Sequence, residues 1–476
     1  MTPMQAAGRA RPASLYNDPA FEYIARKFNA PGPYWTSYPT LGVWKENFDS
    51  KTLDGAYSEF FSGPGKGVPT YLYVHIPFCA MLCWYCMCNV KISNDRGRIN
   101  KFVGYLLREL DLLFANWDRQ KARPNITEIH LGGGTPSHLT NEEFSLLIEK
   151  LRSYIDVDKL DEFAMEIDPR TTKAENLEFY ASQGIDRISF GVQDFDPEVQ
   201  KAIHRVQPPE MIREILPPNV RKRFTGLNFD LLFGLPKQTR ETFRKTVELV
   251  KEFSPERITL LRYAHIPDVR KHMQMIRPAD LPPVEDLPYM FVDSVESLSA
   301  HNYQWVGLDH FARDNDSLGV AAKARTVWRN FGGYTPGRTH HIIGVGPTTT
   351  LSFGRHCAQN VYELKDYYEA IDKGEFPVFR GFTLTEDHLL RREVIYRILC
   401  HLRVDFAQID EAFGIDHRKR FAMELKHIEE EYIAKGMLER RGAVYEVTPL
   451  GRYVLRHICL IFDPFHRGKD YKVHGC

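Results

Sequence analysis

The sequence has no excess charge of either sign and no long apolar run. Lys and Arg together number 62 among 476 residues, and Asp and Glu together also number 62. A neutral chain has no net field that would draw it to nucleic acid or to an anionic membrane. The apolar runs are too short for a membrane span, and the first residues lack the hydrophobic core of a secretory signal. We therefore expect a globular cytoplasmic protein that binds neither nucleic acid nor membrane.

Cysteine is also scarce, and its placement is informative. Three of the eight cysteines, Cys79, Cys83 and Cys86, have the spacing C-x3-C-x2-C directly after a strand-like run over residues 70–78. Three thiolates can hold three irons of a four-iron cluster and leave the fourth iron open. The open iron can bind the amine and the carboxylate of a small molecule, and S-adenosylmethionine (SAM) is the molecule that such a site usually chelates. The spacing therefore favours chemistry at the cluster over simple electron transfer.

Zinc binding and disulfide formation are the alternatives for these cysteines. Cys88 would add a fourth sulfur, but structural zinc sites normally pair two short knuckles, and only one knuckle is present. The remaining cysteines, at positions 357, 400, 459 and 476, are scattered and show no disulfide framework. The cluster is favoured over both alternatives.

Short β-branched or aromatic runs alternate with helical patterns from residue 70 to about residue 267. Six of these runs are expected to be strands, over residues 71–78, 127–132, 163–167, 187–192, 227–233 and 257–263. Between them, apolar residues at helical spacing mark helix faces, such as Phe102, Leu106, Leu110 and Leu113, or Phe243, Val247 and Val250. Thr140 and Glu143 predict a capping box at the start of another helix. Repeated β-α units predict an α/β fold with a partial (β/α)6 barrel.

The pattern divides the chain into four parts. We expect a partly disordered N-terminal arm over residues 1–69, the barrel over 70–267, an α/β extension of its sheet over 268–360, and a mainly helical C-terminal domain over 361–476. Within the last part, residues 438–447 predict a hairpin around Arg441 and Gly442, followed by a final helix. This arrangement resembles a winged helix. Because the chain is neutral, a lid or packing role is favoured over DNA binding.

Unusual residues follow several of the expected strands, at the edge where parallel β-α folds bind their ligands. Residues 132–134 are three glycines, which would let the backbone approach a polar ligand closely, although a tight turn is the alternative. Glu166 and Asp168 follow the third strand, where a carboxylate could accept hydrogen bonds from a ribose or an ammonium group. A buried ion pair is the alternative for these two residues.

Later strand ends add an amide, a cation and a further carboxylate. Gln193, Arg205 and Asp230 occupy these positions, and each alone could be structural. Together with Tyr73 and Tyr85, whose rings could stack on an adenine or shield a radical, they would suit a zwitterionic nucleoside.

With these residues and several further motifs, the chain resembles radical SAM enzymes of the oxygen-independent coproporphyrinogen III oxidase family. The matching motifs lie at residues 79–86, 132–136, 166–170, 191–195, 230–239, 263–265, 309–313 and 329–331. The match extends from residue 32 to the C-terminal helix, which is nearly the whole chain. The resemblance implies a partial barrel that holds a [4Fe-4S] cluster and two SAM molecules, with a C-terminal helical domain over the site.

The resemblance also assigns roles to individual residues. Cys79, Cys83 and Cys86 would ligate the cluster. The SAM on the open iron would contact Tyr73, Gly133, Glu166 and Thr350. The second SAM would contact Tyr85, Gly134, Thr135, Gln193, Arg205, Asp230 and Ala264. Cys88, a fourth cysteine that does not bind the cluster, and Tyr85 would serve the radical step.

The implied reaction begins with one electron from a donor such as flavodoxin or ferredoxin. SAM would be split into methionine and a 5'-deoxyadenosyl radical, which would abstract a hydrogen atom from a substrate propionate. Loss of carbon dioxide and of an electron would leave a vinyl group, converting coproporphyrinogen III to protoporphyrinogen IX. We expect the enzyme to act as a monomer.

The chain departs from the family at several positions. Tyr34 replaces an arginine suited to a propionate, Met87 replaces a glycine, and Gly332 replaces a glutamine. Arg338, His340 and His341 stand in a stretch that the family fills with neutral and acidic residues. The substrate is therefore either coproporphyrinogen III held by other cations, or another small molecule to which the second SAM donates carbon, as in related C-methyltransferases and cyclopropanases. A non-catalytic haem or cluster carrier is a further alternative, which Cys88 and the SAM residues disfavour.

Overall fold

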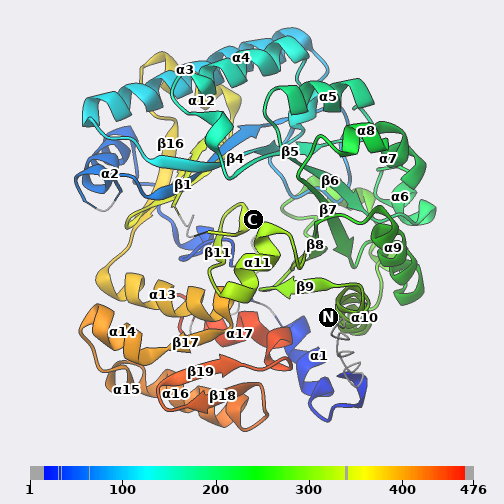
Figure 1. The fold of residues 1–476 in the computed structure, drawn as a ribbon, viewed down its shortest axis with the longest axis vertical. Coiled ribbons are helices and arrows are strands. Elements are labelled where there is room, and N and C mark those ends of the chain that lie inside the picture. Colours follow the sequence, from blue (N-terminus) through cyan, green and yellow to red (C-terminus); the bar gives the residue numbers. More distant parts are fainter. Residues whose placement is uncertain (1–14, 31, 34, 64, 338–340, 467–476) are drawn as a thin grey trace, which may run out of the picture.

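The computed structural model describes residues 15–30, 32–33, 35–63, 65–337 and 341–466. Six parallel strands form the centre of its large sheet in chain order: β1 (Pro69–Ile76), β4 (Asn125–Gly133), β5 (Glu162–Ile167), β6 (Arg187–Gln193), β7 (Gly226–Phe233) and β8 (Arg257–Arg262). They correspond to the six predicted strands and form the predicted partial barrel (Figure 1).

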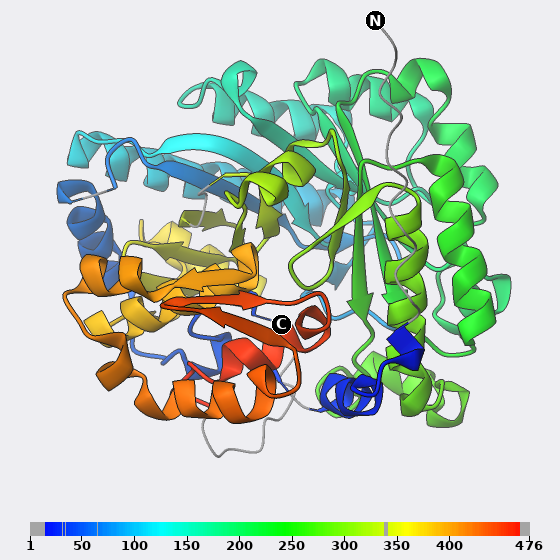
Figure 2. The same cartoon turned by 60° about the horizontal axis from the view of Figure 1, so that its bottom comes forward.

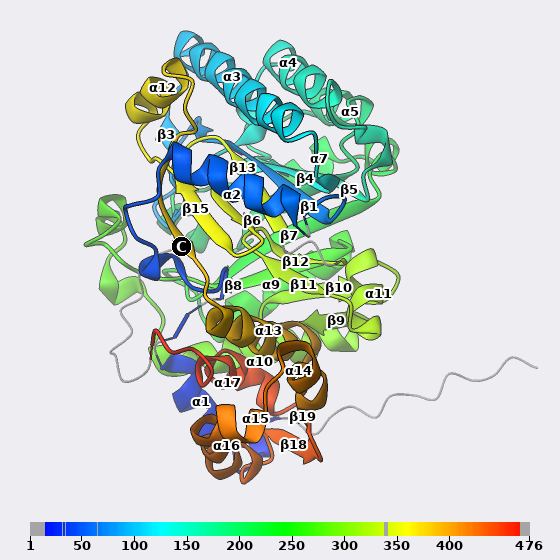
Figure 3. The same ribbon diagram turned by 90° about the vertical axis from the view of Figure 1, so that its left-hand side faces the viewer.

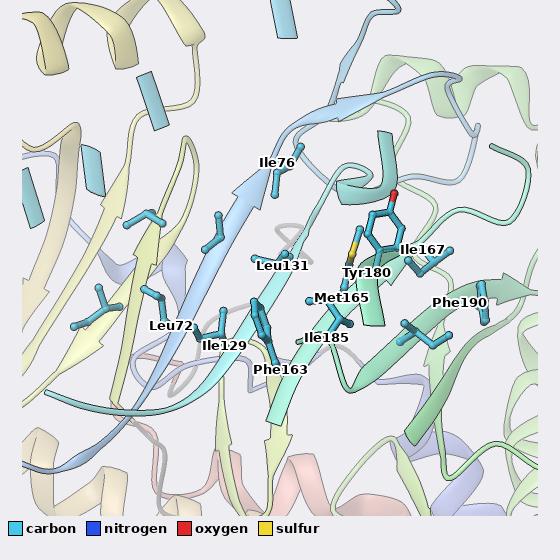
Figure 4. Packing of buried hydrophobic residues seen from close by; sticks show 14 of the residues in the cluster. Leu72, Ile76, Ile129, Leu131, Phe163, Met165, Ile167, Tyr180, Ile185 and Phe190 are labelled. Atoms are coloured by element: carbon cyan, nitrogen blue, oxygen red, sulfur yellow. The ribbon is translucent and has the colours of Figure 1, made fainter. Parts of the chain in front are cut away.

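Helices cover the outer face of these strands. They are α3 (Arg96–Gln120), α4 (Asn141–Arg152), α5 (Ala174–Ser182), α6 (Pro197–Ala202), α7 (Pro209–Ile215), α8 (Pro218–Arg221) and α9 (Arg240–Phe253). The predicted apolar faces of α3 and α9 are buried, and the capping box of Thr140 and Glu143 is present at the start of α4. Figure 4 shows the core between strands and helices, where Leu131 of β4 lies near Met165 of β5 and Tyr180 of α5. Burial of these apolar side chains is the main stabilising contribution to the barrel.

The extension adds strands to both edges of the sheet. After α10 (Leu287–Ala300), β9 (Tyr303–Val306) and β10 (His310–Arg313) join the β8 edge antiparallel, and α11 (Ser317–Ala324) follows. At the other edge, β13 (His341–Val345) pairs parallel with β1, and β14 (Thr350–Phe353), β15 (His356–Asn360) and β16 (Val378–Thr383) follow it. Among the described residues the sheet has 12 strands. Because β16 belongs to it, the sheet continues past the boundary predicted at residue 360.

Smaller elements complete this part of the chain. They are the two-residue strands β2 (Phe78–Cys79) and β3 (Lys91–Ile92), the hairpin β11 (Trp328–Asn330) and β12 (Gly333–Thr335), and α12 (Leu364–Asp372). Figure 3 shows α12 beside α3, and α2 (Ser50–Ser62) lying across the strands near β13 and β15.

The C-terminal part is mainly helical around a three-stranded sheet. It contains α13 (Glu386–His401), β17 (Arg403–Asp405), α14 (Phe406–Phe413), α15 (His417–Arg420), α16 (Ala422–Ile428), β18 (Leu438–Arg441), β19 (Val444–Val447) and α17 (Leu455–Leu460). The predicted hairpin is confirmed as β18 and β19, which pair antiparallel, with β17 on the other side of β19. None of the helices in the described residues is both long and apolar enough to cross a membrane.

The N-terminal arm is folded from residue 15 onward, apart from its undescribed positions. Helix α1 (Phe21–Asn29) lies beside the C-terminal domain (Figure 2), and Ile24, Trp35 and Tyr38 are buried in the core of that domain. Disorder was predicted for part of residues 1–69. Residues 1–14 lie outside the described part of the chain, and the helices of the arm are ordered by packing that the local sequence does not reveal.

Candidate functional site

The three cysteines of the C-x3-C-x2-C motif lie on one loop after β1. Cys79 ends β2, Cys83 is buried, Cys86 is half-buried, and all three are free thiols. Neighbouring segments fix the loop through its carbonyl oxygens: His204 Nδ1 lies 2.8 Å from Leu82 O, and His272 Nε2 lies 2.8 Å from Cys86 O. The cysteine loop, which follows β1, is therefore held by segments that follow β6 and β8.

The spacing of the sulfur atoms is too wide for zinc. Tetrahedral zinc with Zn–S bonds of about 2.3 Å requires sulfurs about 3.8 Å apart. Among the described residues, no three cysteine sulfurs lie within 4.8 Å of one another. A four-iron cluster separates its thiolate ligands more widely, because each thiolate binds a different iron. The donor set and its spacing therefore fit a cluster better than zinc.

Polar side chains donate to two of these sulfurs. Thr135 Oγ1 lies 3.2 Å from Cys79 Sγ, and Cys83 Sγ has Arg170 Nη2 at 3.4 Å and Arg205 Nη1 at 3.6 Å. Burial raises the pKa of Cys79 to about 12, so this thiol would ionise on binding a metal ion rather than alone. The donors stabilise negative charge on the sulfurs, as thiolate ligands require.

Asp168 holds the two arginines in place. It accepts from Arg170 Nη2 at 2.7 Å and lies 3.6 Å from Arg205 Nη1. Although burial opposes ionisation, Arg205 and Arg170 lower the pKa of Asp168 to about 2. The sequence left open whether Asp168 forms a buried ion pair, and the structure confirms that it does. Arg170 was missed as a functional residue, although its place two residues after Asp168 in the matched motif was a usable signal.

The glycine run packs directly against the base of the cysteine loop. A Cβ atom on Gly134 would lie 2.7 Å from the carbonyl carbon of Pro77, and one on Gly133 would lie 2.4 Å from the His75 ring. Gly133 also has φ +111°, which side-chain-bearing residues rarely adopt. Close approach thus requires glycine at both positions, and it leaves their backbone beside the cysteine loop.

Three residues expected at the first SAM are adjacent. Glu166 Oε2 accepts from Gly133 N at 3.3 Å, and Glu166 Oε1 lies 3.2 Å from His130 Nε2. The Tyr73 ring stacks on His130, with ring centroids 5.9 Å apart. Sequence reasoning missed His130, which sits two residues before the glycine run on the same face of β4 as Gly132.

Thr350 lies on the far side of this group. Tyr73 pairs with Gly344 of β13, and a Cβ atom on Gly344 would lie 2.6 Å from Thr350 O. Thr350 Oγ1 is buried and has no hydrogen-bond partner among the described residues. A polar ligand atom would satisfy this hydroxyl.

The residues expected at the second SAM lie around Arg205 and the next strand ends. A Cβ atom on Gly191 would lie 2.8 Å from Gln193 Nε2 and 3.3 Å from Arg205 Nη2, so these two side chains converge on one point. Tyr85 interacts electrostatically with Arg205, while Ala264 is the second residue after β8, at the same end of the strands. The structure thus places these residues at one end of the sheet.

Asp230 is buried on β7, between polar neighbours. It accepts from Ser189 Oγ at 3.1 Å and from Asn228 Nδ2 at 2.9 Å. Burial and the nearby charge of Glu166 raise its pKa. The two predicted groups of SAM residues are therefore electrostatically linked through Glu166 and Asp230.

Cys88 lies two residues beyond Cys86 and is exposed. A hydrogen bond with Cys88 lowers the pKa of Cys86 to about 7 and raises that of Cys88. The Cys88 sulfur therefore lies beside Cys86, and its role in the radical step stays a prediction.

The departures from the family fall in different places. Gly332 N donates to Asn330 Oδ1 at 2.7 Å, and a Cβ atom on Gly332 would lie 2.8 Å from Tyr71 Oη, so the Tyr71 phenol occupies the space of a side chain at 332. His341 packs on Phe60 of α2, with ring centroids 5.1 Å apart, rather than on the side expected to face the substrate. Met87 O accepts from Arg270 Nη2 at 2.6 Å. Tyr34, Arg338 and His340 lie outside the described residues.

Comparison with known proteins agrees with this geometry. Residues 73–250 match the Radical SAM superfamily and residues 384–454 match the HemN C-terminal domain. The oxygen-independent coproporphyrinogen III oxidase of Helicobacter pylori is 35% identical over 447 residues, covering 93% of this chain and 96% of the relative, and that of Escherichia coli K12 is 34% identical over 450 residues, with 94% and 95% covered.

A solved structure shows the same fold. The structure of coproporphyrinogen III oxidase (HemN) from Escherichia coli, a radical SAM enzyme, superposes with a TM-score of 0.84 at 33% sequence identity, covering 91% of this chain and 97% of that chain. The chain thus belongs to the oxygen-independent coproporphyrinogen III oxidase family of radical SAM enzymes.

Proposed function

We propose that this chain oxidatively decarboxylates two propionate groups of coproporphyrinogen III to vinyl groups, giving protoporphyrinogen IX. Relatives named oxygen-independent coproporphyrinogen III oxidase match more than nine tenths of the chain. The observation that carries the proposal is the loop of three free thiols, with donors from Thr135, Arg170 and Arg205 directed at its sulfurs.

Membership in the radical SAM family implies a [4Fe-4S] cluster and SAM. When bound, these groups would supply one-electron chemistry that removes a hydrogen atom from the substrate. Cys79, Cys83 and Cys86 would hold three irons, and the glycine run would place its backbone beside the ligand of the fourth. The chain's own contribution is to orient these groups and to exclude water and oxygen.

We propose that the chain binds two SAM molecules at separate sites. The first would be formed by Tyr73, Gly133, Glu166 and Thr350, and it is supported by their contacts and by the unsatisfied Thr350 hydroxyl. The second would be formed by Tyr85, Gly134, Thr135, Gln193, Arg205, Asp230 and Ala264, and it is supported by the convergence of Gln193 and Arg205. Cys88 and Tyr85 would act in the radical step.

Each propionate loses carbon dioxide and the equivalent of two hydrogen atoms. One hydrogen atom leaves to the radical, and the second leaves as a proton and an electron, so an electron acceptor is needed as well as an electron donor. We propose that a flavodoxin or a ferredoxin is the electron donor. We also propose that the enzyme is a monomer. A loop of free thiols whose sulfurs must stay reduced is consistent with cytoplasmic conditions.

A second candidate function rests on the departures near the site. Met87 lies in the cysteine loop, and Tyr71 fills the space beside Gly332, which supports a substrate that differs from that of the family. The second SAM would then donate a methyl or methylene carbon to another acceptor.

One anaerobic assay separates these functions. The reconstituted, reduced protein is incubated with SAM and coproporphyrinogen III, and the products are identified by mass spectrometry. We expect 5'-deoxyadenosine together with loss of two carbon dioxide units from the substrate. Intact coproporphyrinogen III with carbon transfer to another acceptor would favour the second candidate, and a cluster without any SAM cleavage would favour a carrier.

A further inference from the structure

A cavity lies between the β9 edge of the large sheet and the C-terminal domain, away from the cysteine loop. Its volume is about 260 Å³, and both domains line it: Gln304 and Trp305 of β9 and Lys323 of α11 from one side, and Glu446 of β19 and Arg452 from the other. Figure 1 shows α11 and β9 facing the C-terminal domain. None of the residues proposed for the cluster or for SAM lines this cavity.

Arg452 is a largely buried cation without a counter-ion. Its Nη2 donates to the carbonyl oxygen of Trp305, and its guanidinium carbon lies 4.2 Å from the centroid of the Trp305 ring. Its Nε is buried with no hydrogen-bond partner, and within the described part of the chain no carboxylate lies within ion-pairing distance of it. Burial without compensation lowers the pKa of Arg452 to about 10. Such a group strongly favours the approach of an anion.

The other charged groups around the cavity do not neutralise Arg452. Glu446 is the carboxylate in the lining, and it pairs with Arg325 at 2.5 Å. Lys323 also lines the cavity, and its carboxylate partner Asp314 lies outside the lining at 2.9 Å from Nζ. The lining therefore carries three cations and one carboxylate, and of these cations Arg452 alone has no carboxylate partner among the described residues.

We propose that this cavity binds a small oxyanion, either a phosphate or a carboxylate, between Arg452 and the two cations of its rim, Lys323 and Arg325. The guanidinium has five N–H donors, of which one has a protein acceptor, so it can form the paired hydrogen bonds that oxyanions accept. Because the lining comes from both domains, the bound anion stabilises the junction between the sheet edge and the C-terminal domain.

Inorganic phosphate and acetate are the two probes, and they represent a phosphate ligand and a carboxylate ligand respectively. Each is titrated into the full-length protein at constant ionic strength, with sodium chloride as the balancing salt, and binding is followed by calorimetry and by the thermal midpoint. We expect saturable binding of at least one probe, with a midpoint that rises as the site fills. Arg452→Gln should weaken that binding by about tenfold or more, because a charge-assisted hydrogen bond is lost.

Additional variants separate binding from folding. Arg452 packs on Trp305, so its replacement also alters packing, whereas the Lys323 and Arg325 side chains are 47% and 46% exposed. Lys323→Gln and Arg325→Gln should weaken binding while leaving the midpoint without anion nearly unchanged. Arg277→Gln, at a 74% exposed arginine outside the lining, is the matched control and should bind as the parent does.

The proposal is overturned if neither probe binds saturably. It is also overturned if Arg277→Gln loses as much affinity as the cavity variants, because binding would then follow overall charge. Saturable binding of phosphate alone or of acetate alone supports the proposal and identifies whether the cavity binds a phosphate or a carboxylate.

Discussion

At the residue scale, two arginines stabilise negative charge on the Cys83 sulfur. The guanidinium groups of Arg170 and Arg205 donate hydrogen bonds to this sulfur, and Asp168 holds both groups in place. The cysteine spacing could be recognised from the sequence because the three thiols share one loop. The contact between Arg170 and Cys83 could not, because it depends on how the end of β5 meets that loop, 87 positions away.

The cluster ligands can be tested one by one. We expect Cys83→Ala, and likewise Cys79→Ala or Cys86→Ala, to lower the iron and sulfide content of the reconstituted protein from about four of each per chain to a small fraction. Cys88→Ala is the matched control, since it should keep the cluster and lose product formation. Full iron and sulfide content in Cys83→Ala would rule out this ligand set.

Arg170 should influence the reduction potential of the cluster. Arg170→Gln removes a positive charge and an N–H donor at 3.4 Å from Cys83 Sγ, and these groups favour the extra electron of the reduced cluster. We therefore expect a more negative potential in an anaerobic redox titration followed by electron paramagnetic resonance. Arg119→Gln, at an exposed position on α3, should leave the potential unchanged. An unchanged or more positive potential in Arg170→Gln would contradict this role.

At the element scale, Glu109 connects α3 to the part of the sheet that contains β13 and β15. It is 2% exposed and accepts hydrogen bonds from Gly346 N at 2.5 Å, Asn360 Nδ2 at 2.8 Å and Tyr367 Oη at 2.7 Å. These partners follow β13, end β15 and lie on α12, so one carboxyl group holds the loop that leads to Thr350. The apolar face of α3 was predictable from its spacing, whereas Glu109 within the same helix carries no local signal of its partners.

Glu109 gives a pH dependence with a definite sign. Burial raises its pKa from 4.5 to about 7, so the folded state binds a proton more readily than the unfolded chain. The stabilisation is complete below about pH 4.5 and is lost as the pH rises through about 7, with a magnitude of roughly 3 kcal/mol. Tyr367 and Tyr57, which face the carboxyl group, have pKa values far above this range.

The measurement is the free energy of unfolding between about pH 5 and pH 7 for the parent protein and for Glu109→Gln. We expect the decline with rising pH to be steeper in the parent. Glu178→Gln, at an exposed position on α5, is the matched control and should follow the parent. Parallel curves for the parent and Glu109→Gln would show that Glu109 does not titrate as described.

The pairing of elements was predictable only in part. Each barrel strand pairs with the strand of the next β-α unit, as the alternating pattern predicts. The pairing of β1 with β13 joins Tyr73 to Gly344, and nothing near either residue indicates the other. The same holds for β16, which joins the sheet after the boundary that the helical pattern suggested.

At the scale of the whole molecule, Arg329 joins the N-terminal arm to the extension of the barrel sheet. It pairs with Asp309 through two hydrogen bonds, at 3.0 and 3.1 Å, and its Nε donates to Trp35 O at 3.1 Å. Trp35 Nε1 in turn donates to Arg456 O at 3.1 Å, in the C-terminal domain. The matched motifs containing Asp309 and Arg329 therefore have a structural role that the resemblance alone did not reveal.

Breaking this buried ion pair should destabilise the protein strongly. Asp309→Asn leaves the Arg329 charge buried without its partner, and we expect the free energy of unfolding to fall by about 3–5 kcal/mol. The double variant Asp309→Leu with Arg329→Met removes both charges and should recover a large part of that loss. Urea unfolding followed by circular dichroism measures both, and equal losses in the two variants would argue against an effect of the unpaired charge.

We propose that three thiolates hold the cluster and leave one of its irons open for SAM. Electron–nuclear double resonance on the reduced, reconstituted protein tests this most directly, using SAM labelled with nitrogen-15 in its amine or oxygen-17 in its carboxylate. We predict that both labels couple to the cluster, because both groups bind the open iron. Absence of coupling from either label in a protein that contains its cluster, or metal analysis that finds zinc in place of iron, would contradict the account.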